Sequence, residues 1–389
     1  MFELSLVPLL AIVLSTVGVL VPSATVDARD QRARPSPHAT VSSVPVPAGA
    51  APATLTTPQV RLTRTTPLEF PALVDSNSPA FWRLVDGVDQ LHVMNSYDGL
   101  RQMSRGPTLD TLTLAHPATC TTQCDGRRWL EAILQDGDGT LYGYYHGEPN
   151  RIVCEGVEGK TAPRIGASRS RDGGRTWEDL GIFLEAPAGT EQCETPNQYF
   201  VGGFGDVSAI LDRGQTWVYF FFSAYVGEPS QQGVVVARML WADRDLPVGN
   251  VAVWDASVWR YPSVDPPGVA SVPSPLYPAS VSWHDPSGRV DAFWGPSVHW
   301  NTYLEQYVML LNRAADSAWT QEGIYVAFSP VLDDPSCWTV PYKILSGAWW
   351  YPQVMGLERG AGTDKMAGQV ARFFTEGRSE YLIVFERGR

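Results

Sequence analysis

The sequence has no cluster of lysine and arginine residues, and acidic residues outnumber basic ones. The 389 residues include 29 Lys and Arg against 41 Asp and Glu, which gives a formal net charge of −12 at pH 7. Proteins that bind nucleic acids or anionic lipids present basic patches to the phosphate groups. We therefore expect neither nucleic acid nor a charged membrane surface among the partners of this protein.

Patterns typical of long helices are also missing. The 35 Gly and 31 Pro fall between short apolar runs, as expected where many turns join many strands. Hydrophobic residues make up 44% of the chain, and 14 Trp, 15 Tyr and 14 Phe are enough to fill a large core. The composition therefore predicts an all-β protein.

Cysteine is scarce, with five residues in the chain. This number fits an exported protein with up to two disulfides and one thiol left over, and it leaves their connectivity open. A zinc site is the alternative, because two of the cysteines are only four positions apart, but no second close pair completes the usual ligand set. We predict no metal ligands among these five residues, Cys120, Cys124, Cys154, Cys193 and Cys337.

The N-terminal segment, residues 1–28, is interpreted as a signal peptide. Its apolar run extends from Leu4 to Val21 and is followed by small residues, although Glu3 replaces the usual basic start. An uncleaved membrane anchor is the alternative reading. Residues 29–58 are rich in Pro, Ala, Ser and Thr and predict a solvated linker. Together these features predict a secreted protein, periplasmic or extracellular, which we expect to be a monomer.

An internal repeat runs through the remainder of the chain, residues 59–389. An apolar strand, a turn and a second aromatic strand form a predicted hairpin. These hairpins begin at Ser78, Leu130, Asp206 and Pro296. The following strands also match each other in the segments from Arg164 and Gly323, where Trp177 and Trp338 take equivalent places. Four strands per unit is the pattern of a propeller blade.

A fifth unit begins near Trp350, but too few residues follow it for four long strands. The segment from Pro58 is therefore expected to supply the missing outer strand. That pairing would close the ring and leave no free sheet edge. The sequence thus predicts a five-bladed β-propeller of four-stranded blades, closed by an N-terminal strand.

Residues 170–177, SRDGGRTW, resemble the Asp-box of sialidases and related propellers. The mechanics of such a motif are structural. The Asp side chain accepts hydrogen bonds from the turn backbone, Gly permits a positive φ, and Trp packs between strands. We therefore read this motif as a mark of the fold and assign it no catalytic group.

The region from about residue 60 to 387 resembles the five-bladed propeller glycosidases of the arabinanase, xylosidase and fructosidase type. The resemblance rests on the phrase GDVSAI at 205–210, followed by the turn DRG at 212–214 and the strand WVYFFF at 217–222. It implies that the start of each inner strand faces a central pocket in which carboxyl groups act on a sugar.

Glu131 and Asp206 are the first predicted catalytic pair, since glycoside hydrolysis generally needs one carboxylic acid and one carboxylate. Glu131 lies in an apolar run, where a carboxyl is costly unless it faces a polar cavity or a partner. Such a setting would raise its pKa and suit a general acid; the alternative is a Glu paired with a nearby Arg. Asp206 matches the Asp of the family phrase, although an Asp after a Gly can also cap a turn.

The chain departs from the family pattern in the first blade. The usual catalytic Asp aligns with Asn77, and Asp75 lies two positions earlier. An amide cannot accept a proton at neutral pH, so this departure gives weight to a binding role, with Asp75 as the substitute base.

Further pocket candidates are polar and aromatic residues at strand ends that could contact a sugar. His299 is also a candidate for an axial position near water or a structural cation, which the resemblance implies for some propellers; we expect no other cofactor. The expected substrate-binding residues are Asn77, Trp82, His146, Glu148, His299, Asn301, Tyr351 and Gln353.

The resulting hypothesis is a secreted glycoside hydrolase-like protein that acts on a polysaccharide or glycan through Glu131, Asp206 and Asp75. A non-catalytic carbohydrate-binding propeller is the first alternative. A sialidase is the second, although it needs three arginines around a carboxylate and the inner-strand starts offer no such trio. A protein-interaction scaffold is also compatible with the fold.

Overall fold

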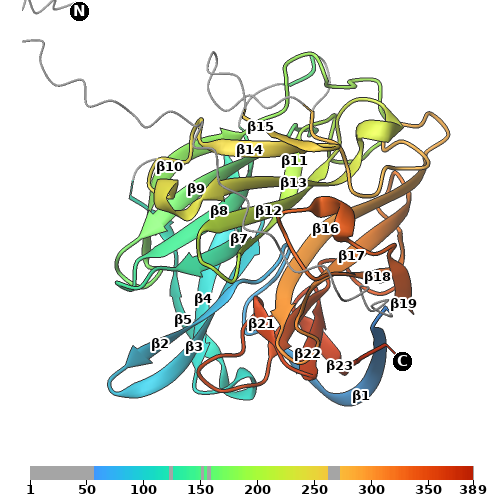
Figure 1. Ribbon diagram of the computed structural model, residues 1–389. Coiled ribbons are helices and arrows are strands. Elements are labelled where there is room, and N and C mark those ends of the chain that lie inside the picture. Colours follow the sequence, from blue (N-terminus) through green and yellow to red (C-terminus); the bar gives the residue numbers. More distant parts are fainter. Residues whose placement is uncertain (1–56, 122–125, 150–152, 156–158, 262–271, 389) are drawn as a thin grey trace, which may run out of the picture. The chain divides into compact units, whose positions relative to one another are not determined.

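Five small sheets make up the part of the chain that the computed structural model describes (Figure 1). The described residues are 57–121, 126–149, 153–155, 159–261 and 272–388. The predicted signal peptide (1–28) and residues 29–56 of the predicted linker lie outside them. No helix within these described stretches is long and apolar enough to cross a membrane.

The first two blades follow the predicted hairpins. Blade one has the strand order β2-β3-β4-β5, with β2 (Ala80–Val85), β3 (Val88–Tyr97), β4 (Leu100–Gly106) and β5 (Thr113–Pro117). Blade two consists of β7 (Arg127–Gln135), β8 (Leu141–Glu148), β9 (Arg164–Ser170) and β10 (Thr176–Leu184), with the short β6 (Thr119–Cys120) pairing parallel to β10.

Blades three and four follow along the chain. Blade three runs β11 (Phe204–Leu211), β12 (Trp217–Ala224), β13 (Gly233–Leu240), β14 (Val251–Asp255) and β15 (Val258–Arg260). Blade four contains β16 (Arg289–Asn301), β17 (Gln306–Asp316), β18 (Gln321–Ser329) and β19 (Tyr342–Ser346). The connections include four short 3-10 helices, η1 (Leu109–Thr111), η2 (Pro229–Gln231), η3 (Trp241–Asp243) and η4 (Pro335–Cys337).

Blade five joins the two ends of the described chain. It combines β20 (Gln353–Gly356), β22 (Val370–Thr375) and β23 (Arg378–Glu386) with β1 (Gln59–Glu69) as its outer strand. β1 pairs antiparallel with β23, and Figure 1 shows the blue β1 beside the red β23. The predicted ring closure is confirmed. Four main strands per blade are confirmed as well, while sheets two, three and four each carry a short fifth strand; in sheet four it is β21 (Met366–Ala367), parallel to β16.

The core lies between blades, because each sheet buries both faces. In β12, Val218, Phe220 and Phe222 pack toward blade two, whereas Tyr219 and Phe221 pack toward blade four. This alternation follows from the two-residue period of a strand. Comparable clusters fill the junctions between blades four and five, one and two, and five and one. Sheet-on-sheet packing therefore continues around the entire ring.

The turn at 170–177 behaves as predicted. The carboxylate of Asp172 accepts hydrogen bonds from the backbone of Arg175 and Thr176, and Gly173 and Gly174 have φ values of 77° and 88°. Trp177 is 1% exposed and donates its indole N–H to the carbonyl of Gly174. Its role is to close a tight turn in blade two.

One disulfide joins Cys154, in the connection between β8 and β9 of blade two, to Cys193, in the connection from blade two to blade three. Cys120 is also disulfide-bonded, Cys337 is a free, exposed thiol, and Cys124 lies outside the described residues. The disulfide between Cys154 and Cys193 ties down the connection from β10 to β11, which supplies part of the pocket wall described next.

Candidate active site

A pocket of about 110 Å³ opens at one end of the ring. All five blades or their connections contribute to it, from the segment before β2 to the segment before β20. Its lining is acidic and aromatic: Asp75, Trp129, His146, Glu148, Tyr199, Phe200, Asp206, Trp319, Trp350 and Tyr351.

Irregularities in two inner strands place the key carboxyl groups. The pairing of β7 with β8 shifts register between Leu130 and Ala132, so that Glu131 occupies a bulge. Leu130 and Ala132 consequently face opposite neighbouring blades, and the side chain between them points toward the ring interior. In β11 the register shifts between Gly205 and Ser208, and Asp206 has a φ of 50°. Bulges of this kind redirect side chains out of the strand alternation.

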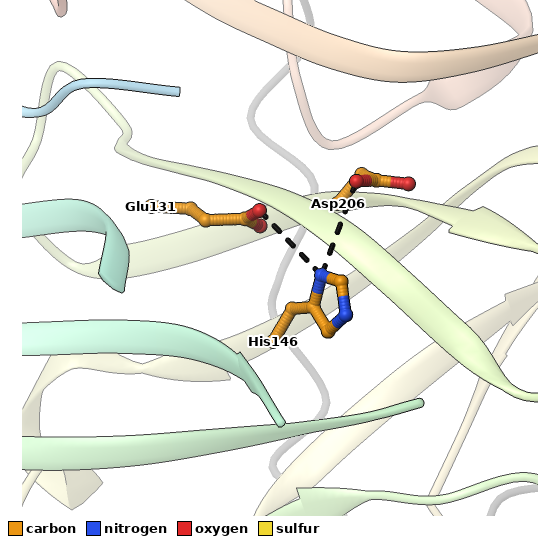
Figure 2. A group of neighbouring side chains, drawn as sticks. All are labelled: Glu131, His146 and Asp206. Atoms are coloured by element: carbon orange, nitrogen blue, oxygen red, sulfur yellow. Dashed lines mark ion pairs between the residues drawn. The ribbon is translucent and has the colours of Figure 1, made fainter. Parts of the chain in front are cut away.

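Glu131, His146 and Asp206 point toward one another (Figure 2). The Nδ1 atom of His146 lies 3.6 Å from Oε1 of Glu131 and 3.9 Å from Oδ1 of Asp206. The Nε2 atom of the same ring lies 3.6 Å from Oε1 of Glu148. A single imidazole therefore stands between three carboxyl groups.

Hydrogen bonds fix the far oxygens of the two buried carboxyl groups. The amide of Val207 donates to Oε2 of Glu131, and the hydroxyl of Tyr225 donates to Oδ2 of Asp206. Glu131, Asp206 and Tyr225 are all at most 2% exposed. These contacts hold both groups in one orientation toward His146.

Burial shifts the pKa values of the acidic groups upward. Burial, reinforced by the charge of Glu131, raises the pKa of Asp206 to about 7 against the opposing charge of His146. Burial also raises the pKa of Asp75 to about 6 and, to an extent limited by His146, that of Glu131. For His146, burial lowers the pKa, but Glu131, Glu148 and Asp206 outweigh it and hold the pKa well above 6.5. The site thus favours an imidazolium beside at least one protonated carboxyl group near neutral pH.

Aromatic rings form the wall of the pocket. The indole of Trp129 stacks on His146 with ring centroids 5.0 Å apart, and Phe200 meets the same imidazole edge-on at 5.9 Å. The ring centroids of Trp319 and Trp350 lie 6.1 Å apart, and Trp319 also packs edge-on against Phe200. Flat rings beside carboxyl groups are suited to a ligand with an apolar face and a polar edge.

The structure brings together six of the predicted site residues, namely Glu131, Asp206, Asp75, His146, Glu148 and Tyr351. Glu131 differs from the prediction in one respect, because it does not line the pocket. It lies behind His146 and Asp206 and is 1% exposed. The carboxyl groups that line the pocket are Asp75, Asp206 and Glu148.

Three predicted binding residues are absent from the pocket lining, and each of their amides forms hydrogen bonds with backbone groups. Asn77 donates to the carbonyl of Pro296 at 3.0 Å. The side chain of Gln353 accepts from the amide of Ser78 at 2.6 Å and donates to the carbonyl of the same residue at 3.0 Å. Asn301 accepts from two backbone amides in the turn after β16. The three amides hold blades and turns together, and contact of these residues with a substrate stays a prediction.

Trp82 and His299 also lie away from the pocket lining. Trp82 donates its indole N–H to the carbonyl of Gly362, so it packs at the joint of blades five and one. His299 is fully buried in β16, where burial and the charge of Lys365 lower its pKa to about 3. A neutral imidazole is therefore buried in blade four, and neither residue belongs to the lining of the described pocket.

Three pocket residues, and Tyr225 which holds Asp206, escaped the sequence prediction. Tyr199 and Phe200 belong to the connection from β10 to β11, and Trp319 lies in the turn between β17 and β18, none of which carries a repeat signal. Tyr225 directly follows β12, which corresponds in blade three to the end of β8, where His146 and Glu148 stand. Comparing the ends of second strands across the repeat would have found it.

The same residues offer donors to a metal ion. One atom each of Glu131, His146 and Asp206 lies within 4.8 Å of the others, a combination of nitrogen and oxygen ligands that suits several divalent cations. Ligation would need the unprotonated Nδ1 of His146. Because His146 favours its protonated form here, a bound cation would displace that proton.

No protein-family model matches the chain. No curated protein matches it either. Among solved structures, a thermostable family-43 glycoside hydrolase is 14% identical, with 82% of this chain and 92% of that chain covered and a TM-score of 0.46. An endo-arabinase from Bacteroides thetaiotaomicron is 12% identical, with 82% and 96% covered and a TM-score of 0.44. An α-L-arabinanase from Penicillium chrysogenum, complexed with arabinobiose, is 10% identical, with 80% and 83% covered and a TM-score of 0.46. Identities this low assign no role to any side chain of the pocket.

Proposed function

We propose that this protein is a glycoside hydrolase that acts in the pocket at the ring end. One observation carries the proposal: Asp75 and Asp206 line the same pocket, and burial raises their pKa values to about 6 and about 7. Two carboxyl groups whose pKa values differ can hold one proton between them near neutral pH. Glycoside hydrolysis requires one protonated and one ionised carboxyl group.

Asp206 takes the role of general acid in this scheme, because it has the higher pKa and remains protonated to higher pH. It delivers its proton to the oxygen of the leaving group. Asp75, ionised above about pH 6, acts at the anomeric carbon. It either activates a water molecule that attacks this carbon or attacks the carbon itself. Glu148, at the pocket rim, is available to contact sugar hydroxyls.

Glu131, His146 and Tyr225 are positioning residues in this proposal. The imidazolium of His146 interacts with Glu131 and Asp206 from one side, and the hydroxyl of Tyr225 holds Asp206 from the other. Rigid support of this kind keeps an acid within reach of its target oxygen. Trp350, which is only partly buried in the pocket lining, offers a flat face on which a sugar ring can stack.

The test is release of reducing sugar by the purified full chain from neutral polysaccharides, including arabinan and galactan. Asp206→Asn and Asp75→Asn each remove one proton-transfer group and should lower release by roughly 10²–10⁴-fold. Asp86→Asn is the matched control, since Asp86 is exposed in the β2–β3 turn and Asn tolerates its φ of 50°. Equal activity of the two pocket variants and the control would contradict the assigned roles.

A non-catalytic carbohydrate-binding propeller is the second candidate. The small volume of about 110 Å³ favours it, because such a cavity accepts little more than the end of a glycan. Glycan binding without release from any polysaccharide would establish this alternative. A sialidase receives no support, because no arginine is among the residues that line the described pocket. The disulfides support export to an oxidising compartment, which we propose as the location.

A further inference from the structure

The segment between β19 and β20, residues 347–352, carries two adjacent tryptophans that line two different hollows. Trp350 lines the central pocket, whereas Trp349 lines a second hollow of about 350 Å³. The amide of Glu376, in the turn between β22 and β23, donates to the carbonyl of Trp350. Arg378, which begins β23, pairs in register with Glu69 at the end of β1. Both hollows therefore lie at the same end of the ring.

The second hollow, named here the Trp349 groove, lies between the outer strands of blades four and five. It is defined by groups from the end of β19, the following segment, the start of β23 and the end of β1. The polar and aromatic groups relevant to binding are Ser346, Trp349, Arg378, Glu380 and Glu69. A volume of about 350 Å³ falls within the range of ordinary ligand sites.

The indole of Trp349 is exposed and held in one orientation. Its side chain is 57% exposed, although burial of an indole is normally favourable. The guanidinium of Arg378 lies 5.5 Å from the ring centroid of Trp349, and its Nε atom lies 3.7 Å from Oε1 of Glu69. The cation fixes the orientation of the indole while more than half of its surface remains free.

A neutral glycan matches this groove. The C–H face of a sugar stacks on an exposed indole, and its hydroxyls can donate to Glu69 and Glu380 and accept from Arg378. Two carboxylates against one guanidinium, on a chain with a net charge of −12, disfavour polyanionic glycans. A purely apolar ligand would make no use of these charged groups.

We propose that the Trp349 groove is a second glycan-binding site, which holds a distant part of the same neutral polysaccharide that enters the central pocket. This inference rests on the proposed function in taking a glycan as the ligand. Attachment at the groove raises the effective concentration of chain ends and branches at the central pocket. Trp349 and Trp350, adjacent in sequence, couple the two sites through one short segment.

The experiment is affinity gel electrophoresis of the full chain in gels that contain arabinan, galactan, arabinoxylan or β-glucan. All variants carry Asp206→Asn, so that hydrolysis does not alter the gel. Trp349→Ala should weaken retardation by the preferred polysaccharide about three- to tenfold, the loss expected for one aromatic contact. Trp349→Phe, which retains a flat ring, should restore part of it. Affinity for a trisaccharide, measured by calorimetry, should change less than twofold.

Tyr261→Ala is the matched control, because Tyr261 is similarly exposed at 59% and lies outside the groove. Melting temperatures of all variants should agree within a few degrees. Retardation of Trp349→Ala equal to that of the control, or no retardation of the parent protein by any of the four polysaccharides, overturns the inference. Sugar release is measured separately on the chain that retains Asp206. Weakened binding of Trp349→Ala together with no release by that chain would sustain the groove and reject the hydrolase proposal, whereas release with unaltered binding would do the reverse.

Discussion

Tyr225→Phe tests whether the electrostatics of the pocket control the acid. The substitution keeps the buried ring and removes only the hydroxyl that donates to Oδ2 of Asp206. That hydrogen bond stabilises the ionised carboxylate and so lowers the pKa of Asp206, which burial raises to about 7. Hydrogen bonds to charged groups contribute about 1.5–3 kcal/mol, and one pKa unit corresponds to about 1.4 kcal/mol. The pKa of Asp206 should therefore rise by about one to two units.

The assay is kcat/KM on the best polysaccharide of the panel between pH 4 and pH 10. A general acid must be protonated, so activity falls as the pH rises through its pKa, and this pKa sets the alkaline limb of the profile. In Tyr225→Phe the alkaline limb should move to higher pH by at least about one unit. Tyr277→Phe is the control, since Tyr277 donates its hydroxyl to the carbonyl of Thr339 away from the pocket. An alkaline limb that stays in place, or moves to lower pH, would refute Asp206 as the acid.

Three further results follow from the same contacts. The folded-state pKa of Asp206 lies above its ordinary value of 3.8, so ionisation of this group lowers the stability of the protein as the pH rises through about 7. Asp206→Asn should therefore have a higher melting temperature than the wild type at pH 8, with a smaller difference at pH 4. A melting difference independent of pH would contradict the raised pKa. Replacing Cys154 and Cys193 by Ala removes a cross-link over 39 positions and should lower the free energy of unfolding by about 4 kcal/mol in denaturant titrations. Asn77→Asp replaces a buried donor by an acceptor facing the carbonyl of Pro296, and should cost about 1–3 kcal/mol without a gain in activity; increased sugar release would show that position 77 supplies the base.

The architecture was predicted from local sequence patterns, and these were sufficient for the strands and the blades. Alternating apolar residues such as those of β12 pack on two neighbouring blades, because a strand presents successive side chains to opposite faces. The outer place of β1 in blade five followed from counting strands after Trp350. Asp206 and His146 were assigned to one pocket because equivalent strand ends of a propeller meet at one end of the ring.

The sequence could not show which polar residues at the strand starts reach the pocket. The partner of Asn77 is 219 positions away and that of Gln353 is 275 positions away, so nothing local distinguishes a pocket amide from one that ties two blades together. Glu131 was recognised as a costly carboxyl in an apolar run, but its place behind His146 depends on a bulge in β7. A shift of one residue reverses the face of every following side chain, and only the pairing of complete strands decides where such a shift occurs.

The sequence by itself therefore determined the class of the fold, the number of blades, the closure of the ring and the group of carboxyl residues near its axis. These features follow from the periodicity and composition of single strands and hairpins. The tertiary structure decided which carboxyl groups line the pocket, that Tyr225 and His146 contact Asp206, and that Trp349 faces a separate groove. Those features depend on distances between residues of different blades. Burial, charge and hydrogen bonding act between such residues, and the sequence pattern of a single strand does not show them.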